Sequence, residues 1–338
     1  MTFTTTNSYA YHFTKHLQEP YIIIEKIHTT VDKIVLTRVY TSLEDIHNQL
    51  IENGKTQKDT GTRRKDGTVD VNRRLRTYRL HGKEIAILYT AYLPENLPQD
   101  LSIIIHEPDH TIMEEVDVIL QILNTSPSVS KIELAWDFYT NQAILLKMWF
   151  RDHLWLCYNR KGCSTYKDYD DDPRYKNTDY ISNPRDSTKG IRVYPRPIGS
   201  SPSEYLRLEL QLNRPVIRKM GIKFPLTPSQ LSIDYKKFFR FCCIDYDRLV
   251  KSYLRHLNAD RYQINHRATH PLRRHAGALY QQQLSSDITS IQRNKLTLVE
   301  KMASIKKLGL SNHTRFLKPL EELERIISEL ACAQGFSI

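Results

Sequence analysis

Three segments of the chain alternate polar and apolar residues, and their polar positions carry the groups that metal-assisted phosphodiester cleavage uses. The segments are 131–138, 190–196 and 205–212. A strand sends alternate side chains to opposite faces, so Arg207 and Glu209 share one face of the last segment while its leucines share the other. The same spacing puts Tyr194 and Arg192 on a polar face. We therefore expect carboxylates, arginines and a tyrosine to meet on one sheet surface.

Carboxylates at these positions are candidate ligands for a divalent cation. Asp137 and Glu209 are the main candidates and Glu133 is a third. Oxygen ligands favour Mg²⁺ or Mn²⁺ over zinc. Structural roles remain open, because Asp137 could cap the following helix, although Asn141 is better placed for that. Glu209 could also be an ordinary surface carboxylate paired with Arg207.

The overall charge indicates a polyanionic partner. The 338-residue chain has a formal net charge of +11, which favours nucleic acid. Its five cysteines include no CxxC pair, so we expect neither a zinc site nor a disulfide framework, and a reducing cytoplasm is the simpler interpretation. No stretch has the length and apolar character of a membrane span. These features predict a soluble intracellular protein.

The elements that must position the candidate residues form two predicted domains. Residues 1–225 read as an α+β domain with a largely antiparallel sheet and flanking helices, and residues 226–338 as a helical domain for DNA recognition or oligomerisation. A Ser-x-x-Asp capping box predicts that a helix begins near Ser42. Strands are expected at 21–28, 33–40, 84–92, 101–107, 131–138, 178–182, 190–196 and 204–212, and helices at 111–124, 141–156, 232–257, 276–309 and 315–334.

The segment 53–83 is the most basic part of the chain, with ten cations against three acids. Its turn sequences predict a mobile loop or a hairpin. Such a segment could be a solvated loop, but its charge favours contact with DNA phosphates, which position a protein without reading sequence. The DNA-binding candidates, here and on the strands, are Arg63, Arg64, Lys65, Arg73, Arg74, Arg76, Lys189 and Arg196.

The order of elements over residues 131–221 resembles the Rep_trans-type replication initiators of rolling-circle plasmids and filamentous phages. The matching positions are Asp137 in KIELAWDF, Tyr180 in DYISN, Tyr194 in IRVYPR, and Arg207 and Glu209 in EYLRLELQL. The chain departs from the family at two places. Pro195 and Arg196 follow Tyr194 where the family has Asp-Lys or Asn-Lys, and Ser182 replaces a glycine.

This resemblance implies a metal-dependent nick with covalent capture. A tyrosine oxygen attacks a phosphodiester, which gives a 5′-phosphotyrosine and frees a 3′-hydroxyl for extension. Tyr194 is the main candidate nucleophile, with Arg192 and Arg207 beside it as catalytic arginines. The alternatives as nucleophile are Tyr180, Tyr166, Tyr169 and Tyr175. The implied partners are a replication origin in single-stranded or hairpin form, a host helicase and a second copy of the chain.

Two other functions stay open at this stage. One is a DNA-binding regulator that keeps the fold without catalysis. The other is a carboxylate-metal nuclease or integrase that uses water in place of a tyrosine, and that forms no covalent adduct with DNA.

Overall fold

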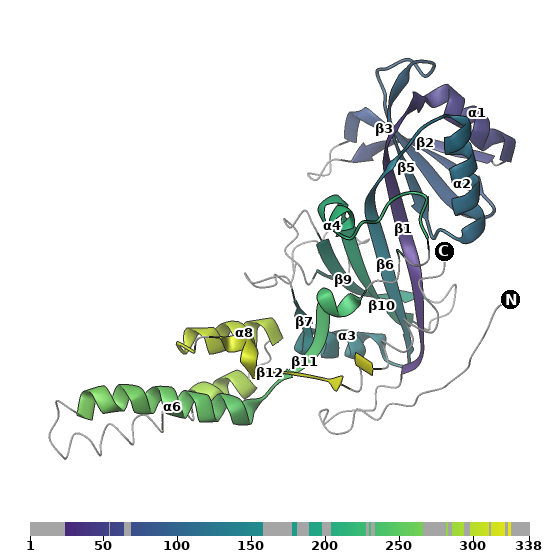
Figure 1. The fold of residues 1–338 in the computed structure, drawn as a ribbon. Coiled ribbons are helices and arrows are strands. Elements are labelled where there is room, and N and C mark those ends of the chain that lie inside the picture. The colour runs from purple at the N-terminus through teal and green to yellow at the C-terminus, as the bar shows by residue number, and fades with distance from the viewer. Residues whose placement is uncertain are drawn as a thin grey trace. The chain divides into compact units, whose positions relative to one another are not determined.

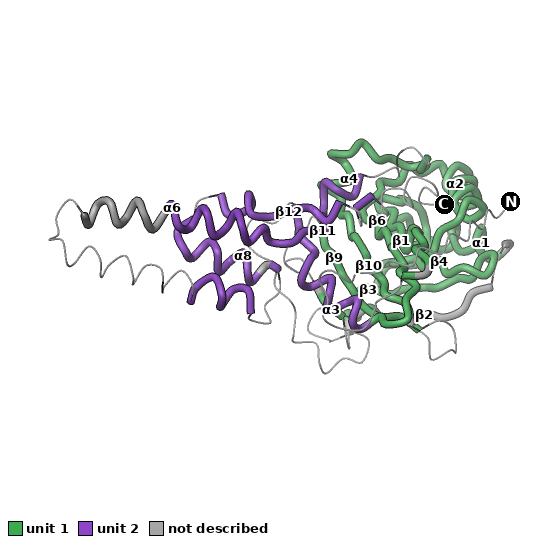
Figure 2. Tube along the Cα trace, turned by 90° about the horizontal axis from the view of Figure 1, so that it is seen from below, with its two compact units in different colours: residues 1–143, 165–233, 329–338 green, residues 144–164, 234–328 purple. Residues whose placement is uncertain are grey.

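The computed structural model covers the whole chain and describes most of it. The described residues are 24–53, 55–63, 69–157, 178–180, 189–197, 204–227, 230, 234–265, 282, 286–293, 298–310, 312–321 and 324–325. They form two compact units, which are coloured separately in Figure 2. Unit 1 comprises residues 1–143, 165–233 and 329–338, and unit 2 comprises residues 144–164 and 234–328.

Unit 1 is built on a nine-stranded antiparallel sheet. In sheet order the strands are β2 (Lys55–Arg63), β3 (Val69–Leu80), β4 (Lys83–Thr90), β5 (Pro98–His106), β1 (Ile24–Ser42), β6 (Ser128–Thr140), β10 (Glu204–Asn213), β9 (Lys189–Pro197) and β8 (Asp179–Tyr180). The predicted α+β class with a largely antiparallel sheet is confirmed.

Strand β1 is one continuous strand of 19 residues, so the prediction of two strands joined by a polar link was wrong. The link contains Thr29, Thr30 and Val31, whose β-branched side chains suit an extended backbone, and it contains no glycine or proline. β1 pairs with β6 along most of its length, as Figure 1 shows. The register shifts between Val31 and Lys33, which leaves Asp32 as the extra residue of a β-bulge.

The basic segment forms the β2–β3 hairpin, as its turn sequences predicted, although residues 64–68 lie outside the described part. His81 and Gly82 join β3 to β4 with φ angles of 48° and 79°. A two-residue turn with two positive φ angles matches the right-handed twist of the paired strands.

Three helices cover apolar surfaces of this sheet. They are α1 (Leu43–Asn53), α2 (His110–Ile122) and α4 (Arg214–Lys219). The predicted cap of α1 is confirmed, because the backbone N–H of Asp45 donates to Ser42 Oγ over 2.9 Å. α4 packs on β6 and β10, where Leu206, Leu208 and Leu210 are fully buried. With one face of β6 and β10 covered in this way, their polar residues occupy the other.

Unit 2 combines helices with a small sheet of order β12-β11-β7. Its elements are α3 (Ala143–His153), β7 (Leu154–Leu156), η1 (Tyr235–Lys237), β11 (Phe239–Ile244), α6 (Tyr246–Asn265), α8 (Leu298–Lys307), η2 (His313–Phe316) and β12 (Leu317–Pro319). The expected helix at 232–257 therefore begins only at Tyr246, because the aromatic and cysteine-rich run before it is extended.

The division between the units differs from the expected boundary at residue 225. Residues 144–164 come before β8, β9 and β10 of the large sheet in the sequence. They nevertheless belong to unit 2, because β7 pairs with β11. Among the described residues, no helix is both long and apolar enough to cross a membrane.

Candidate functional site

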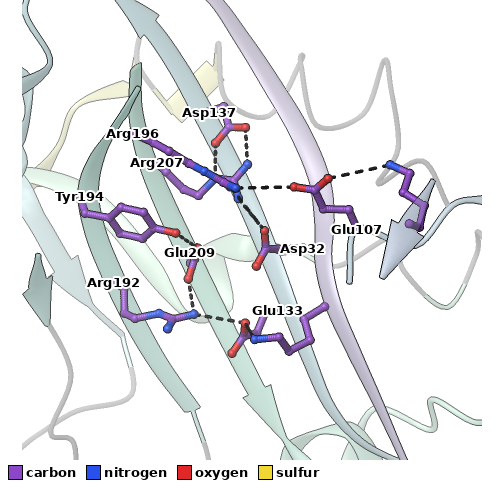
Figure 3. A network of polar contacts seen from close by, with 11 residues as sticks. Asp32, Glu107, Glu133, Asp137, Arg192, Tyr194, Arg196, Arg207 and Glu209 are labelled. Carbon is purple, nitrogen blue, oxygen red and sulfur yellow. Dashed lines mark hydrogen bonds and ion pairs between the residues drawn. The ribbon is translucent and has the colours of Figure 1, made fainter. Parts of the chain in front are cut away.

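Strands β6, β10 and β9 are neighbours in the sheet, and their register brings the predicted polar residues together. Arg207 lies opposite Asp137 on β6 and opposite Tyr194 on β9. Two residues further along β10, Glu209 lies opposite Arg192. Figure 3 shows these side chains in one network on the polar face. The alternation in sequence therefore identified residues that share a surface.

Tyr194 and Glu209 form the centre of this network. The Tyr194 hydroxyl donates a hydrogen bond to Glu209 Oε1, and Arg192 forms an ion pair with Glu209 Oε2. Burial raises the pKa of Tyr194 above its usual range, and the neighbouring Glu209 carboxylate raises it further. Burial also raises the pKa of Glu209, and Arg192 opposes that effect. The hydroxyl thus stays protonated while its proton points at a carboxylate of increased basicity.

Glu133 is fully buried and has three basic neighbours. Its carboxylate lies 2.5 Å from Lys131 Nζ, 3.2 Å from Lys33 Nζ and 3.2 Å from Arg192 Nη2. Burial alone would raise the pKa of Glu133, but the charges of Lys131, Arg192 and Lys33 outweigh burial and lower it to about 2. This carboxylate is therefore ionised in the folded chain at any ordinary pH.

Asp137 forms a two-pronged ion pair with Arg207 instead of facing an open position. Arg207 Nε and Nη2 donate to the two carboxylate oxygens over 2.6 and 2.7 Å, and Arg207 Nη1 donates to Asp32 over 2.5 Å. Burial opposes the charge of Arg207, but its bonds to Asp137 raise its pKa on balance. Because both oxygens of Asp137 accept from Arg207, the geometry favours other carboxylates as metal ligands.

Three carboxylates meet the geometric requirement for a metal ion within the described part of the chain. One oxygen each from Asp32, Glu133 and Glu209 lies within 4.8 Å of the others. Two of them were predicted ligands, whereas Asp32 was not. The bulge in β1 turns Asp32 toward this face, and the strict alternation used for prediction does not apply at a bulge. The only sequence signal was an adjacent acid and base, Asp32 and Lys33, in a strand of mixed polar and apolar residues.

A pocket of about 480 Å³ opens beside the tyrosine. Its basic lining residues are Arg79, Lys83, His106 and Arg196, and its acidic ones are Asp32, Glu84 and Glu107. Arg196 lies 3.9 Å from Asp32 and 3.7 Å from Glu107, so it lies at the edge of the three clustered carboxylates and is not enclosed by them. Tyr194 also lines the pocket, which gives its ring access to solvent from this side.

The other predicted DNA-binding residues have different surroundings. Arg73 and Arg74 are exposed on β3, as a DNA contact requires. Arg76 is buried over the Tyr89 ring, and its two terminal nitrogens donate to Glu95 over 3.0 and 2.7 Å, so it is engaged within the fold. Candidates whose side chains lie outside the described part are Arg63, Arg64, Lys65 and Lys189, together with Tyr180, Tyr166, Tyr169 and Tyr175.

Comparison of the chain with protein-family models and with curated proteins finds no match. The case for a function therefore rests on the arrangement of the residues themselves.

Proposed function

We propose that the chain nicks DNA and transfers the strand through Tyr194, with a divalent cation, as an initiator of rolling-circle replication. One observation carries the proposal. A pocket-lining tyrosine hydroxyl donates to Glu209, and Glu209 belongs with Asp32 and Glu133 to a group of three close carboxylates. A nucleophile, a base and candidate metal ligands are then within reach of one another.

The proposed step is an attack of the Tyr194 oxygen on a DNA phosphodiester. Glu209 takes the hydroxyl proton while the Tyr194 oxygen attacks the phosphorus, the bond from phosphorus to the 3′ oxygen breaks, and that oxygen takes a proton from solvent. The products are a 5′-phosphotyrosine and a free 3′-hydroxyl. Base assistance is needed because the pKa of Tyr194 is raised, so the phenolate does not form on its own.

The carboxylates of Asp32, Glu133 and Glu209 would hold Mg²⁺ or Mn²⁺, which prefer oxygen ligands. A bound ion would neutralise charge on the non-bridging phosphate oxygens. It must compete with cations that are already present, because Lys33 and Arg192 contact Glu133. We therefore expect weak binding of the ion, and an affinity that rises when one of these cations is removed.

The arginines divide into two roles in this proposal. Arg192 and Arg207 are both engaged by carboxylates, so they act as positioning residues that orient Glu209 and Asp32. Arg196 is less buried and lines the pocket, and it is the cation that would contact the scissile phosphate. Exposed Arg73 and Arg74 would contact flanking phosphates. A replication origin, a host helicase and a second copy of the chain remain the partners that the family resemblance suggests, in the cytoplasm.

The test is covalent capture of a single-stranded oligonucleotide in the presence of Mn²⁺. The label is placed 3′ of the nick, because that fragment stays on the protein. The wild type should give a labelled band on a denaturing gel, and Tyr194→Phe should give none while it still binds the oligonucleotide. Tyr139→Phe is the matched control, since Tyr139 lies on β6 of the same sheet and does not line the pocket. An adduct of equal yield in Tyr194→Phe would exclude Tyr194, and peptide mass spectrometry would then identify the nucleophile.

One observation favours a second candidate function, a DNA-binding regulator without catalysis. The carboxylates Asp32, Glu133, Asp137 and Glu209 face the cations Lys33, Lys131, Arg192, Arg196 and Arg207. With five cations beside four carboxylates, the network needs no metal ion to compensate its negative charge. The wild type would then bind the oligonucleotide and give no nick with either Mg²⁺ or Mn²⁺.

A further inference from the structure

A second charged surface lies in unit 2, which contains none of the residues assigned above. A pocket of about 700 Å³ is bounded by the start of α6, by the end of β11 and by residues of η2 and β12. Five basic side chains line it, against two acidic ones. The basic residues are Arg248, Lys251, Arg255, Arg315 and Lys318, and the acidic ones are Asp245 and Asp247.

Three of the cations form a row on one face of α6. Arg248, Lys251 and Arg255 are spaced by three and four residues, which puts them above one another on a helix. The opposite face of the helix is anchored in the core, where Leu249 is fully buried and Tyr253 is 3 % exposed. The Tyr253 hydroxyl also donates to Asp287 over 2.7 Å. The row therefore points outward from a fixed helix.

The other two cations are held beside this row by the backbone. The backbone N–H of Asp245 donates to the carbonyl of Phe316 over 2.8 Å, and Phe316 is fully buried. Lys318 pairs with Cys243 in the β11–β12 ladder. These contacts fix Arg315 and Lys318 against the first turn of α6, which Figure 1 shows next to β11 and β12.

All five cations are exposed, and no ion pair within the described part of the chain involves any of them. The two acidic residues do not neutralise the pocket, because five cations outnumber them. Asp245 Oδ1 also accepts from the backbone N–H of Arg248 as a helix cap. The start of α6 is thus capped from within the chain, so the attraction for an anion comes from the side chains.

We propose that this pocket binds the phosphate backbone of a nucleic acid, independently of base sequence. From Arg248 to Arg255 the helix rises by about 10 Å, at about 1.5 Å per residue. That length spans about three successive phosphates of one strand at about 3.4 Å of rise each. A row of arginine and lysine side chains suits charge contacts that position a duplex without reading its bases. The surface deepens the proposed function by adding a DNA contact, but it does not depend on Tyr194 chemistry.

The test uses the full chain with Arg248, Lys251 and Arg255 changed to glutamine, a residue of similar helix propensity. Fluorescence anisotropy without metal ion measures binding to a duplex and to a single strand, each in two unrelated sequences. The slope of the logarithm of the binding constant against the logarithm of salt concentration falls by about one for each lost phosphate contact. The variant should therefore show a slope smaller by about three, and its affinity should be at least tenfold weaker at 0.15 M salt. The loss should be equal for both sequences.

The matched control changes three exposed lysines of unit 2 that do not line the pocket, Lys237, Lys306 and Lys307, to glutamine. It has the same net charge as the test variant and should keep most of the affinity. A loss of affinity for the duplex alone, or for the single strand alone, supports the proposal and identifies which form of DNA the pocket binds. Equal affinity of the two variants for both the duplex and the single strand overturns it. Binding is measured without metal ion and adduct formation with Mn²⁺, so failure of nicking and failure of this surface are separable.

Discussion

The buried Glu133 carboxylate allows a quantitative test of the network. Changing Glu133 to glutamine removes one acid from beside Lys131, Lys33 and Arg192 while nearly keeping the side-chain volume. The pKa of Glu133 is lowered from 4.5 to about 2, and each unit of pKa corresponds to about 1.4 kcal/mol. The ionised side chain therefore contributes about 3 kcal/mol to the stability of unit 1 at pH 7. The side chains of Lys33, Lys131 and Arg192 are half-buried, and each would lose this partner.

The pH dependence follows from the direction of the shift. A lowered pKa means that the contribution is complete above the unfolded value of 4.5 and is lost as pH falls toward 2. The free-energy difference between wild type and Glu133→Gln should be about 3 kcal/mol at pH 7 and about half of that at pH 3.

The assay is urea denaturation followed by the fluorescence of Trp136, which is buried on β6. Trp149 and Trp155 are changed to phenylalanine in all variants, so that the signal reports on unit 1 alone. The exposed Glu84 on β4, changed to glutamine, is the control and should alter stability by less than about 0.5 kcal/mol. A loss below about 1 kcal/mol for Glu133→Gln at pH 7, or a loss that does not change with pH, would refute the reasoning.

Three further predictions concern the same face of the sheet. Mn²⁺ should raise the melting temperature of the wild type, and Asp32→Asn should abolish that rise. An unchanged rise in the variant would remove Asp32 from the metal ligands. Because only the ionised Glu209 carboxylate can take the Tyr194 proton, the rate of adduct formation should fall as pH decreases and Glu209 becomes protonated. Glu209→Gln should lower that rate by about 10²- to 10⁴-fold, and a rate that keeps the wild-type pH profile would exclude Glu209 as the base. Arg207→Met should cost about 3–5 kcal/mol in urea denaturation by leaving Asp137 buried without its partner, and adding Asp137→Leu should recover much of that loss. A double variant as unstable as the single one would contradict this account.

The alternation of residues was sufficient to predict which side chains share the polar face. Arg192 and Tyr194 on one strand, and Arg207 and Glu209 on another, lie on the same side because the pleat of a strand has a period of two. The class of the fold and the cap at Ser42 were also predictable, since both depend on local patterns. The strand Phe239–Ile244 was missed because a short apolar run before a helix can continue that helix or precede it.

The tertiary structure alone decided which of the predicted residues are free to act. The sequence does not show that β10 lies between β6 and β9. This strand order makes Asp137 the ion-pair partner of Arg207. The sequence also does not show the bulge that brings Asp32 beside Glu209, because a bulge depends on the register of two strands far apart in the chain. Side-chain type and face are local properties of a strand, whereas partners and pKa values depend on which strands become neighbours.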